Sequence, residues 1–249
     1  MALSFKLMKL YLIATPIGNL GDMTPRAIET IKSLDVLFCE DTRHTGNLLS
    51  LLNIPRPPIV LSNHDHNERG NAARVVGFLN DGKTVGICSD AGCPVISDPG
   101  FPAVRAAIEA GHDVIPIPGP NAAILALMAS GLPASSFTFK GFAPRKPGNR
   151  RRFLEEEKDS RHTLVFYESP FRIGKLLQEA FEAYGDRAAA VCLELTKQFE
   201  RVQRGPLSQL AADYKDKKVK GEAVIVIEGN GRNKPLEEED SDSPEAKKN

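Results

Sequence analysis

The segment from Ser89 to Gly100 concentrates carboxylates among small residues. It contains Asp90 and Asp98, and it has no lysine, arginine or histidine. Such a loop would repel a triphosphate, and the Gly-Lys-Ser/Thr ending of a phosphate-binding P-loop is missing. We therefore expect it to hold a cationic or hydroxyl-bearing ligand. For Asp98, which precedes a proline, a role as turn anchor is an equal alternative.

Two further loops combine proline and glycine with small residues. Pro16 and Gly18 follow one apolar run, and residues 118–123 follow another. The chain contains no Gly-x-Gly-x-x-Gly string, so a dinucleotide fingerprint is absent. Each loop alone is explained as ordinary turn architecture. Together with the acidic loop, however, all three follow predicted strands, and open α/β sheets bind ligands at the carboxyl ends of their strands.

Histidines and acids after another predicted strand raise the question of a metal. His64 and His66 stand beside acidic residues, but no other cysteine or histidine has a zinc-ligand spacing. We therefore expect no metal site and interpret these residues as hydrogen-bonding loop residues that contact the substrate. The string at residues 39–44, which includes Glu40, either contacts the substrate or forms an internal ion-pair network.

The most basic stretch of the chain spans residues 140–152. It holds six lysines and arginines and no acidic residue. We interpret it as a loop that binds nucleic-acid phosphates, with a solubilising role as the alternative. A second basic patch at residues 215–220 has the same two interpretations. The candidate phosphate contacts in the first stretch are Arg145, Lys146, Arg150, Arg151 and Arg152.

Short β-rich runs alternate with helical patterns over residues 10–118, which predicts a mostly parallel sheet with crossover helices. The second half has fewer helices per strand, which predicts a mixed sheet. The expected fold is therefore two α/β domains, residues 1–131 and 132–231, followed by a disordered charged tail at 232–249. Strands are expected at 10–14, 36–39, 59–61, 84–89, 113–117, 137–142, 163–168, 188–194 and 223–228, and helices include 121–130, 170–184 and 207–214.

The composition is that of an ordinary globular protein, since 41% of the 249 residues are apolar and 26% are charged. No apolar run approaches the ~20 residues of a membrane span, and no signal-peptide pattern begins the chain, so a cytoplasmic protein is expected. The formal net charge is zero. However, residues 1–125 carry ten basic and twelve acidic residues, whereas residues 126–231 carry 18 and 14. The neutral total therefore does not exclude an enzyme that acts on nucleic acid.

Seven strings resemble, in order and spacing, those of one enzyme family. They are CEDTRHTGNLLSLLNI, SDAGCPVISDPGFP, PIPGPNAAILALMASGLP, FKGFAPRK, FYESPFRI, ELTKQFERVQRG and KGEAVIVIEG. The family is that of the bacterial 16S ribosomal RNA 2'-O-ribose cytidine methyltransferases, which are tetrapyrrole-methylase-like (class III) enzymes. The resemblance covers about residues 8–229. It departs at Cys93 and Val95, where the family carries Thr and Gly, and at Asn121, where it carries Ser.

The resemblance implies a cofactor, S-adenosylmethionine, in a cleft between the two α/β domains. It also implies a homodimer and, as substrate, a cytidine in the decoding region of the small ribosomal subunit. A sulfonium cation with an amino-acid end suits an acidic loop without basic residues, and methyl transfer to an acceptor depends mainly on positioning. The residues expected to bind the cofactor are Pro16, Gly18, Ser89, Asp90, Ala91, Gly92, Ile96, Asp98, Pro120, Asn121, Ala122 and Tyr167.

Three residues at predicted strand ends are candidates for the chemical step: Glu168, Lys197 and Glu222. A ribose hydroxyl is a weak nucleophile and gains from a positioned proton acceptor, so at least one of them is expected to be needed for turnover. Lys197 has the alternative of pairing with a phosphate or stabilising negative charge on oxygen. For each residue, a solvated charge or a helix-cap partner is the structural alternative.

Two other functions are compatible with many of these features. A small-molecule methylase of the tetrapyrrole branch would share the fold, although the basic stretch and the strings around His64 and Glu168 speak against it. A ribosome-associated RNA-binding module without catalysis would not need the three loops. Binding of S-adenosylmethionine distinguishes this second alternative, because an inactive module need not bind it.

Overall fold

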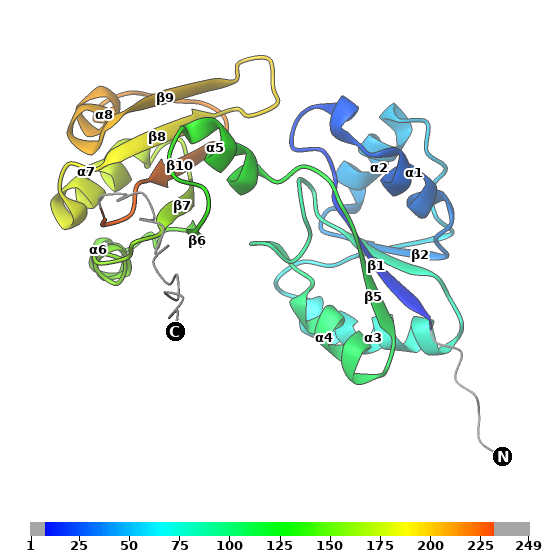
Figure 1. Ribbon diagram of the computed structural model, residues 1–249. Helices are drawn as coiled ribbons and strands as arrows, with labels where there is room; N and C mark the ends of the chain where they lie inside the picture. The colour runs from blue at the N-terminus through cyan, green and yellow to red at the C-terminus, as the bar shows by residue number, and fades with distance from the viewer. Residues whose placement is uncertain (1–7, 232–249) are drawn as a thin grey trace, which may run out of the picture.

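The computed structural model describes residues 8–231 and contains two sheets of five strands each (Figure 1). The strands of the first sheet are β1 (Lys9–Ile13), β2 (Val36–Cys39), β3 (Ile59–Ser62), β4 (Val85–Cys88) and β5 (Asp113–Ile117). They are parallel throughout, in the order β3-β2-β4-β1-β5. Every residue of β2 and β4 is buried, as expected for a parallel sheet covered on both faces.

Helices cover both faces of this sheet. They are α1 (Pro25–Lys32), α2 (Thr42–Leu51), α3 (Glu68–Asn80) and α4 (Phe101–Glu109), with a short 3-10 helix, η1 (Leu20–Asp22), before α1. On one face, Ile31 of α1 packs in the same core as Leu37 of β2. On the other, Leu79 of α3 and Ala107 of α4 share a core with Phe38. Successive residues of β2, such as Leu37 and Phe38, therefore pack in cores on opposite faces of the sheet. Figure 1 shows α1 and α2 on one face of this sheet and α3 and α4 on the other.

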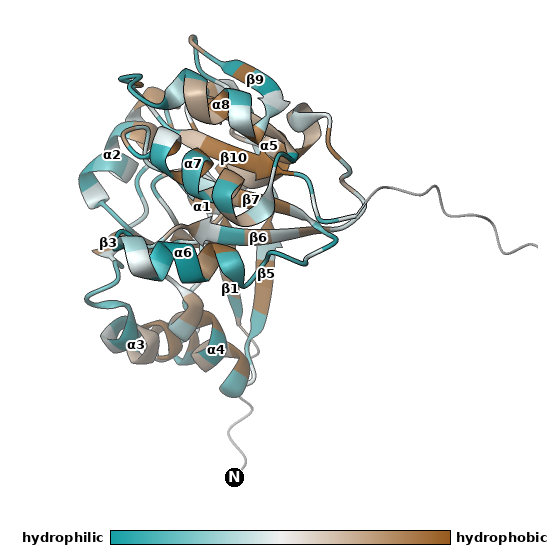
Figure 2. Ribbon diagram, turned by 90° about the vertical axis from the view of Figure 1, so that its left-hand side faces the viewer, coloured by the Kyte–Doolittle hydropathy of each residue, from teal (hydrophilic) through white to brown (hydrophobic). Residues whose placement is uncertain are grey.

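The second sheet is mixed, as predicted. Its strands are β6 (Phe137–Phe142), β7 (Thr163–Glu168), β8 (Ala188–Leu193), β9 (Arg201–Pro206) and β10 (Ala223–Ile227). They lie in the order β6-β7-β10-β8-β9, with β6 and β7 parallel and the other pairs antiparallel. All five residues of the central strand β10 are buried, and this strand is brown in the hydropathy colouring of Figure 2.

Strand β9 is not among the strands expected from sequence. Its residues, RVQRGP, are exposed or half-buried, so they carry no apolar alternation. The strand is held instead by its antiparallel backbone pairing with β8 at the edge of the sheet. Backbone pairing of this kind leaves little trace in the sequence of an edge strand.

The second sheet is also covered on both faces. Three helices, α6 (Pro147–Glu155), α7 (Ile173–Tyr184) and α8 (Leu207–Tyr214), share one core. Helix α5 (Ala122–Ser130) covers the other face, where Ala126 and Leu127 share a core with Cys192 and Val226. The boundary predicted after residue 131 gave α5 to the first domain, whereas its packing places it with the second sheet. The helix is apolar around much of its surface, so its sequence does not reveal which sheet it covers.

The predicted tail at residues 232–249 lies outside the described residues. Within residues 8–231, no helix is both long enough and apolar enough to span a membrane.

Candidate active site at the junction of the two sheets

A cavity of about 400 Å³ lies between the carboxyl edge of the first sheet and the second sheet. Its walls come from the loops after β1, β2 and β4, from the start of α5, and from residues at the ends of β6, β7 and β10. The residues that line it are Ile17, Glu40, Asp90, Ala91, Gly92, Cys93, Ile96, Ser97, Asp98, Asn121, Ala122, Phe142, Tyr167, Glu168, Ser169, Pro170, Gly221, Glu222, Ala223 and Val224. We call it the first cavity, and its volume is typical of small-molecule sites.

Backbone hydrogen bonds join the loops after β1 and β4. Thr15 and Gly92 form an isolated bridge in which Thr15 N donates to Gly92 O at 2.9 Å and Gly92 N donates to Thr15 O at 3.0 Å. The Ser89 hydroxyl donates to Gly92 O at 3.3 Å. Ser89 is therefore a buried residue that shapes the loop, and it does not line the cavity.

The acidic loop contains unusual backbone conformations. Gly92, Val95 and Ser97 have φ angles of 85°, 76° and 63°. This region favours glycine and is costly for a β-branched residue, which agrees with the glycine that the resembling family carries at the position of Val95. Asn121 stands where the family carries serine, and both residue types can cap a helix. Its side-chain oxygen caps α5 by accepting a hydrogen bond from Ile124 N at 3.2 Å.

The charged residues that line the first cavity are all acidic: Glu40, Asp90, Asp98, Glu168 and Glu222. Burial raises the pKa of Asp98 to about 6, and the nearby carboxylates of Glu40 and Asp90 act in the same direction. Burial and the charge of Asp90 also raise the pKa of Glu40. Among the described residues that line this cavity there is no lysine, arginine or histidine, so a bound cation would relieve the repulsion between these carboxylates.

Aromatic side chains form another part of the wall. The ring of Tyr167 lies 4.9 Å from that of Phe139 and 5.5 Å from that of Phe142, measured between centroids. Phe142 is 58% exposed and lines the cavity. With Ile96 and Val224, the rings of Phe142 and Tyr167 give the cavity an apolar side that suits a flat heterocycle such as adenine.

Glu168 lines the first cavity but is already engaged. Its side chain is fully buried and ion-paired with Arg172, and its Oε1 accepts from Ser169 N at 2.6 Å. Burial raises the pKa of Glu168, while the Ser169 N–H and Arg172 oppose that shift. The second oxygen, Oε2, is buried and has no hydrogen-bond partner in the described part of the chain. One carboxylate oxygen thus remains available to a ligand or a water.

A second cavity, of about 350 Å³, adjoins the first. The two share four lining residues: Ile17, Asp90, Ala91 and Glu222. The remaining wall of the second cavity comes from the loop after β1, from η1, from α2 and from the β8–β9 turn. These residues are Pro16, Gly18, Leu20, His44, Asn47, Leu48, Leu51 and Lys197. Pro16 and Gly18, which were expected to bind the cofactor, therefore line this neighbouring cavity.

Lys197 is held between two carboxylates. Its Nζ lies 3.0 Å from Glu194 Oε1 and 2.8 Å from Glu222 Oε2. Burial acts to lower the pKa of Lys197, but the hydrogen bonds to these carboxylates raise it overall. Its aliphatic stem crosses the backbone of Gly18, where an added Cβ would lie 2.4 Å from Lys197 Cγ. Two of the three predicted catalytic residues, Lys197 and Glu222, are thus in direct contact, whereas Glu168 occupies a different wall of the first cavity.

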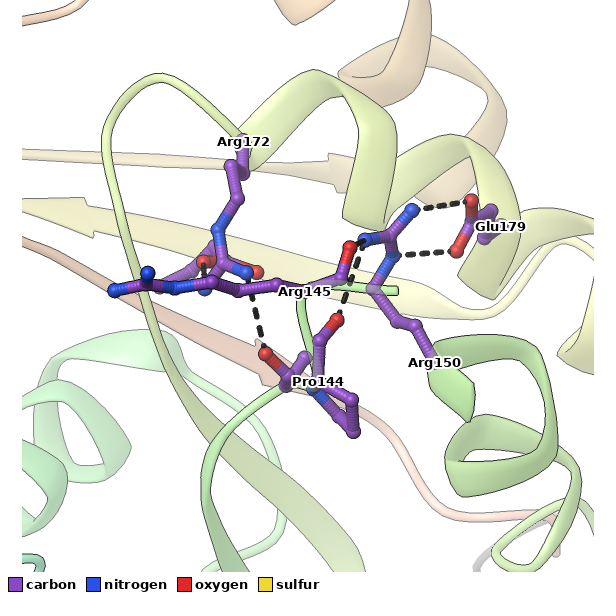
Figure 3. Close-up of polar contacts among 7 residues, drawn as sticks. Pro144, Arg145, Arg150, Arg172 and Glu179 are labelled. Atoms are coloured by element: carbon purple, nitrogen blue, oxygen red, sulfur yellow. Dashed lines mark hydrogen bonds and ion pairs between the residues drawn. The ribbon is translucent and has the colours of Figure 1, made fainter. Parts of the chain in front are cut away.

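The structure corrects the prediction for Arg150, which was expected to bind phosphate. Arg150 is only 2% exposed, and its guanidinium donates to both oxygens of Glu179, at 2.6 and 2.7 Å (Figure 3). Its remaining nitrogen donates to the carbonyls of Pro144 and Arg145. This side chain fixes the start of α6 against α7 and is not available to RNA.

The segment around Arg150 is also not a loop throughout, because residues 147–155 form α6. Lys140 is half-buried and paired with Glu157 at 2.7 Å. Four of the five predicted phosphate contacts are exposed: Arg145, Lys146, Arg151 and Arg152. The basic surface is therefore smaller than the sequence suggested: Arg145 and Lys146 directly precede α6, and Arg151 and Arg152 lie within it.

Several lining residues were not predicted. Phe142, Ser169, Pro170, Gly221, Ala223 and Val224 come from the second sheet, and Ile17, Cys93 and Ser97 come from the predicted loops. Pro120 lines neither cavity, although its carbonyl accepts from Cys93 Sγ at 3.7 Å. His64 and His66 also line neither cavity, and no cluster of potential metal ligands occurs among the described residues. The six missed residues of the second half lie at or beside the ends of predicted strands, so examining those strand ends in the sequence could have identified them.

Comparisons with known proteins show the family of the chain. A family model described as Tetrapyrrole (Corrin/Porphyrin) Methylases matches residues 9–211. "Ribosomal RNA small subunit methyltransferase I" of Halalkalibacterium halodurans is 46% identical over 92% of this chain and 78% of its own length. The proteins of the same name from Vibrio cholerae and Bacillus subtilis are 47% and 41% identical over 88% and 92% of this chain, and over 77% and 78% of their own lengths.

Solved structures share the fold. Uroporphyrin-III-C-methyltransferase from Thermus thermophilus superposes with a TM-score of 0.61 at 20% identity, over 88% of this chain and 94% of that chain. Cobalt precorrin-4 methyltransferase, a cobalamin biosynthetic enzyme, gives a TM-score of 0.57 at 18% identity, over 89% of this chain and 95% of that chain.

The fold and the site define an S-adenosylmethionine-dependent methyltransferase built from two α/β units. The chain belongs to the tetrapyrrole (corrin/porphyrin) methylase family. The first cavity fits this cofactor, because its charged groups are all carboxylates, one buried carboxylate oxygen lacks a partner, and an aromatic and aliphatic wall faces them.

Proposed function

We propose that this protein methylates the ribose 2'-oxygen of a cytidine in the decoding region of 16S ribosomal RNA, the position numbered 1402. The observation that carries the proposal is a cavity whose charged lining residues, within residues 8–231, are all carboxylates, and which shares lining residues with a second cavity. A methyl donor and an acceptor need two such compartments in contact. The names of relatives that are 41–47% identical support ribosomal RNA as the acceptor.

We assign the cofactor to the first cavity. The carboxylates of Asp90 and Asp98 would interact with its cationic or hydroxyl groups, and the wall of Ile96 and Tyr167 would contact its heterocycle. Ala91, Gly92 and Ala122 have small side chains or none, which would let the ligand approach the backbone, and the polar side chain of Asn121 lines the same wall. When bound, the cofactor supplies an electrophilic methyl group on a sulfonium.

The chemical step forms one carbon–oxygen bond, breaks one carbon–sulfur bond and releases the hydroxyl proton. Glu222 is placed to accept this proton, because it borders both cavities and its side chain is 71% exposed. Lys197 holds Glu222 in position and uses two of its three N–H groups on carboxylates, which leaves one for developing charge on oxygen. Glu168, ion-paired with Arg172, is a positioning residue on the cofactor side.

The acceptor RNA is held by the exposed cations near the start of α6. Arg145, Lys146, Arg151 and Arg152 would contact phosphates without reading sequence. The small ribosomal subunit as partner, a homodimeric assembly and a cytoplasmic location follow from the family resemblance and belong to the same proposal.

Ribose methylation mapped across small-subunit RNA, from cells with and without the gene, tests the proposal. We expect one cytidine of the decoding region to lose its 2'-O-methyl group, and full restoration by the wild-type gene. An unchanged methylation map would contradict the function. Methylation of a tetrapyrrole by the purified protein, with RNA unchanged, would instead support a small-molecule methylase. A protein that does not bind S-adenosylmethionine in calorimetry would be a non-catalytic module.

A further inference from the structure

We propose that the second cavity receives the acceptor nucleoside, and that the outward face of α2 is the wall against which its base packs. This inference rests on the proposed function, which needs an acceptor site but does not say where it is. The first observation is the shared wall: Asp90, Ala91 and Glu222 line both cavities. A ligand in each would meet across these residues, as a direct transfer between donor and acceptor requires.

The charges of the two cavities decide which ligand each one takes. The charged residues lining the first cavity, within the described chain, are carboxylates alone, so it suits the cationic cofactor. The second cavity contains Lys197 and His44 beside Asp90 and Glu222. Its charges are mixed, and several groups can exchange hydrogen bonds with a neutral base and a ribose. A volume of about 350 Å³ is sufficient for one nucleoside.

The α2 wall has the chemistry of a base-binding surface. His44, Asn47 and Leu51 are spaced at i, i+3 and i+7, so they share one helix face, and all three are exposed. Leu51 is 66% exposed, and Leu20 of η1, across the same cavity, is 39% exposed. In the described chain, neither His44 nor Asn47 has a side-chain hydrogen bond to another protein group. The two exposed leucines could pack against the face of a nucleobase that is flipped out of the RNA stack. The side chains of His44 and Asn47 could form hydrogen bonds with its edge.

Another part of the lining of the second cavity, Gly18, Lys197 and Glu222, is suited to the ribose. Lys197 crosses Gly18 and presents its ammonium at the border with the first cavity, next to Glu222. A base against α2 and a ribose against this pair would put the ribose hydroxyl at the shared wall. Pro16 and Gly18 thus become acceptor-site residues, in place of the cofactor-binding role that the sequence suggested for them.

The test compares two substitutions of exposed aliphatic residues. Leu51→Glu places a charge inside the second cavity, and Ile108→Glu makes the same kind of change on α4, where Ile108 is 60% exposed and lines neither cavity. Both proteins are assayed for steady-state methylation of small subunits that lack the modification, and for S-adenosylmethionine affinity by calorimetry. Both positions are exposed, so both variants are expected to fold as the wild type does.

We expect Leu51→Glu to lower kcat/KM for RNA by about tenfold or more, with cofactor affinity within about twofold of wild type, and Ile108→Glu to change neither. Asn47→Ala is expected to raise KM for RNA in the same assay. Wild-type methylation by both Leu51→Glu and Asn47→Ala would overturn the inference and leave the proposed function intact. Loss of cofactor affinity in Leu51→Glu alone would also overturn it, since the second cavity would then hold the cofactor. Absence of RNA methylation by the wild-type protein would count against the proposed function itself.

Discussion

Asp98 is the described carboxylate whose titration bears most directly on the cofactor. It lines the first cavity, and burial raises its pKa from an ordinary value of 3.8 to about 6. In the absence of cofactor, the folded protein therefore binds this proton more tightly than the unfolded chain does. The contribution of Asp98 to the free energy of unfolding falls as the pH rises from about 4 to about 6, and it changes no further above that interval.

A pH prediction for the cofactor follows, because a cation is bound better by the ionised carboxylate. We expect the affinity for S-adenosylmethionine to increase between pH 5 and pH 7, and Asp98→Asn to weaken binding at pH 7 and flatten this increase. Calorimetry across that range measures both. An Asp98→Asn protein with the wild-type pH profile would show that Asp98 acts only as a turn anchor.

Neighbouring arginines in α6 have opposite roles. Replacing Arg150 by alanine leaves Glu179, whose side chain is 14% exposed, without its partner, which costs about 3 kcal/mol of unfolding free energy. Arg151 and Arg152 are exposed, so alanine at both should leave stability within about 0.5 kcal/mol of wild type and weaken RNA binding in a salt-dependent way. Urea unfolding and RNA binding at two salt concentrations separate the two effects. Equal loss of stability in both variants would contradict the assignment.

At the scale of elements, turns rather than helices bring the site together. The loop after β1 is bonded to the loop after β4 through Thr15 and Gly92, and the β8–β9 turn crosses it at Gly18. Glu194 and Thr196 in that turn have φ angles of 51° and 67°, so the turn reaches Gly18 through backbone conformations uncommon for residues other than glycine. The position of Lys197 therefore depends on the fit between turns from the two sheets.

Gly18→Ala tests this fit. A methyl group at Gly18 would lie 2.4 Å from Lys197 Cγ and would sit on a backbone with φ of 144°, so the lysine or the turn must move. We expect the single-turnover rate to fall by about 10- to 100-fold, because small displacements of reacting groups are costly. Gly77→Ala is the matched control, since nothing lies within 4 Å of the added methyl in α3 and the helix gains up to about 1 kcal/mol. A wild-type rate in the Gly18→Ala protein would contradict the proposed role of Lys197 in the chemical step.

At the scale of the whole molecule, the two sheets contribute different parts of the two cavities and of the charged surface. The first sheet supplies the acidic loop and the α2 wall, and the second supplies the aromatic wall, the Lys197–Glu222 pair and the exposed cations of α6. The formal charge of the chain is zero because an acidic first half and a basic second half are combined with an acidic C-terminal segment. This division fits an enzyme that binds a cation on one side and a polyanion on the other.

The sequence alone determined nine of the ten strands and the edge of the first sheet that faces the cavities. Periodic apolar runs and turn residues are local signals, so four strands, β2, β5, β6 and β7, have the bounds that were predicted. Parallel strands also align their carboxyl ends, so the loops after β1, β4 and β5 could be placed together without a structure. Ten of the fifteen residues predicted for catalysis or cofactor binding line the first cavity. Seven of them come from the loop after β4 and the start of α5, and the other three, Tyr167, Glu168 and Glu222, come from the second sheet.

Only the tertiary structure decided which side chains are free to act. Arg150 and Arg151 are adjacent and chemically identical, yet one is buried on Glu179 and the other is exposed, because a helix turns successive side chains toward different surroundings. The sheet that α5 covers, the pairing of β9 and the contact of Lys197 with Gly18 depend on partners distant in the sequence. Local patterns record which residues are apolar, charged or able to turn. They do not record which distant group each one meets, and that pairing fixes the chemistry of this site.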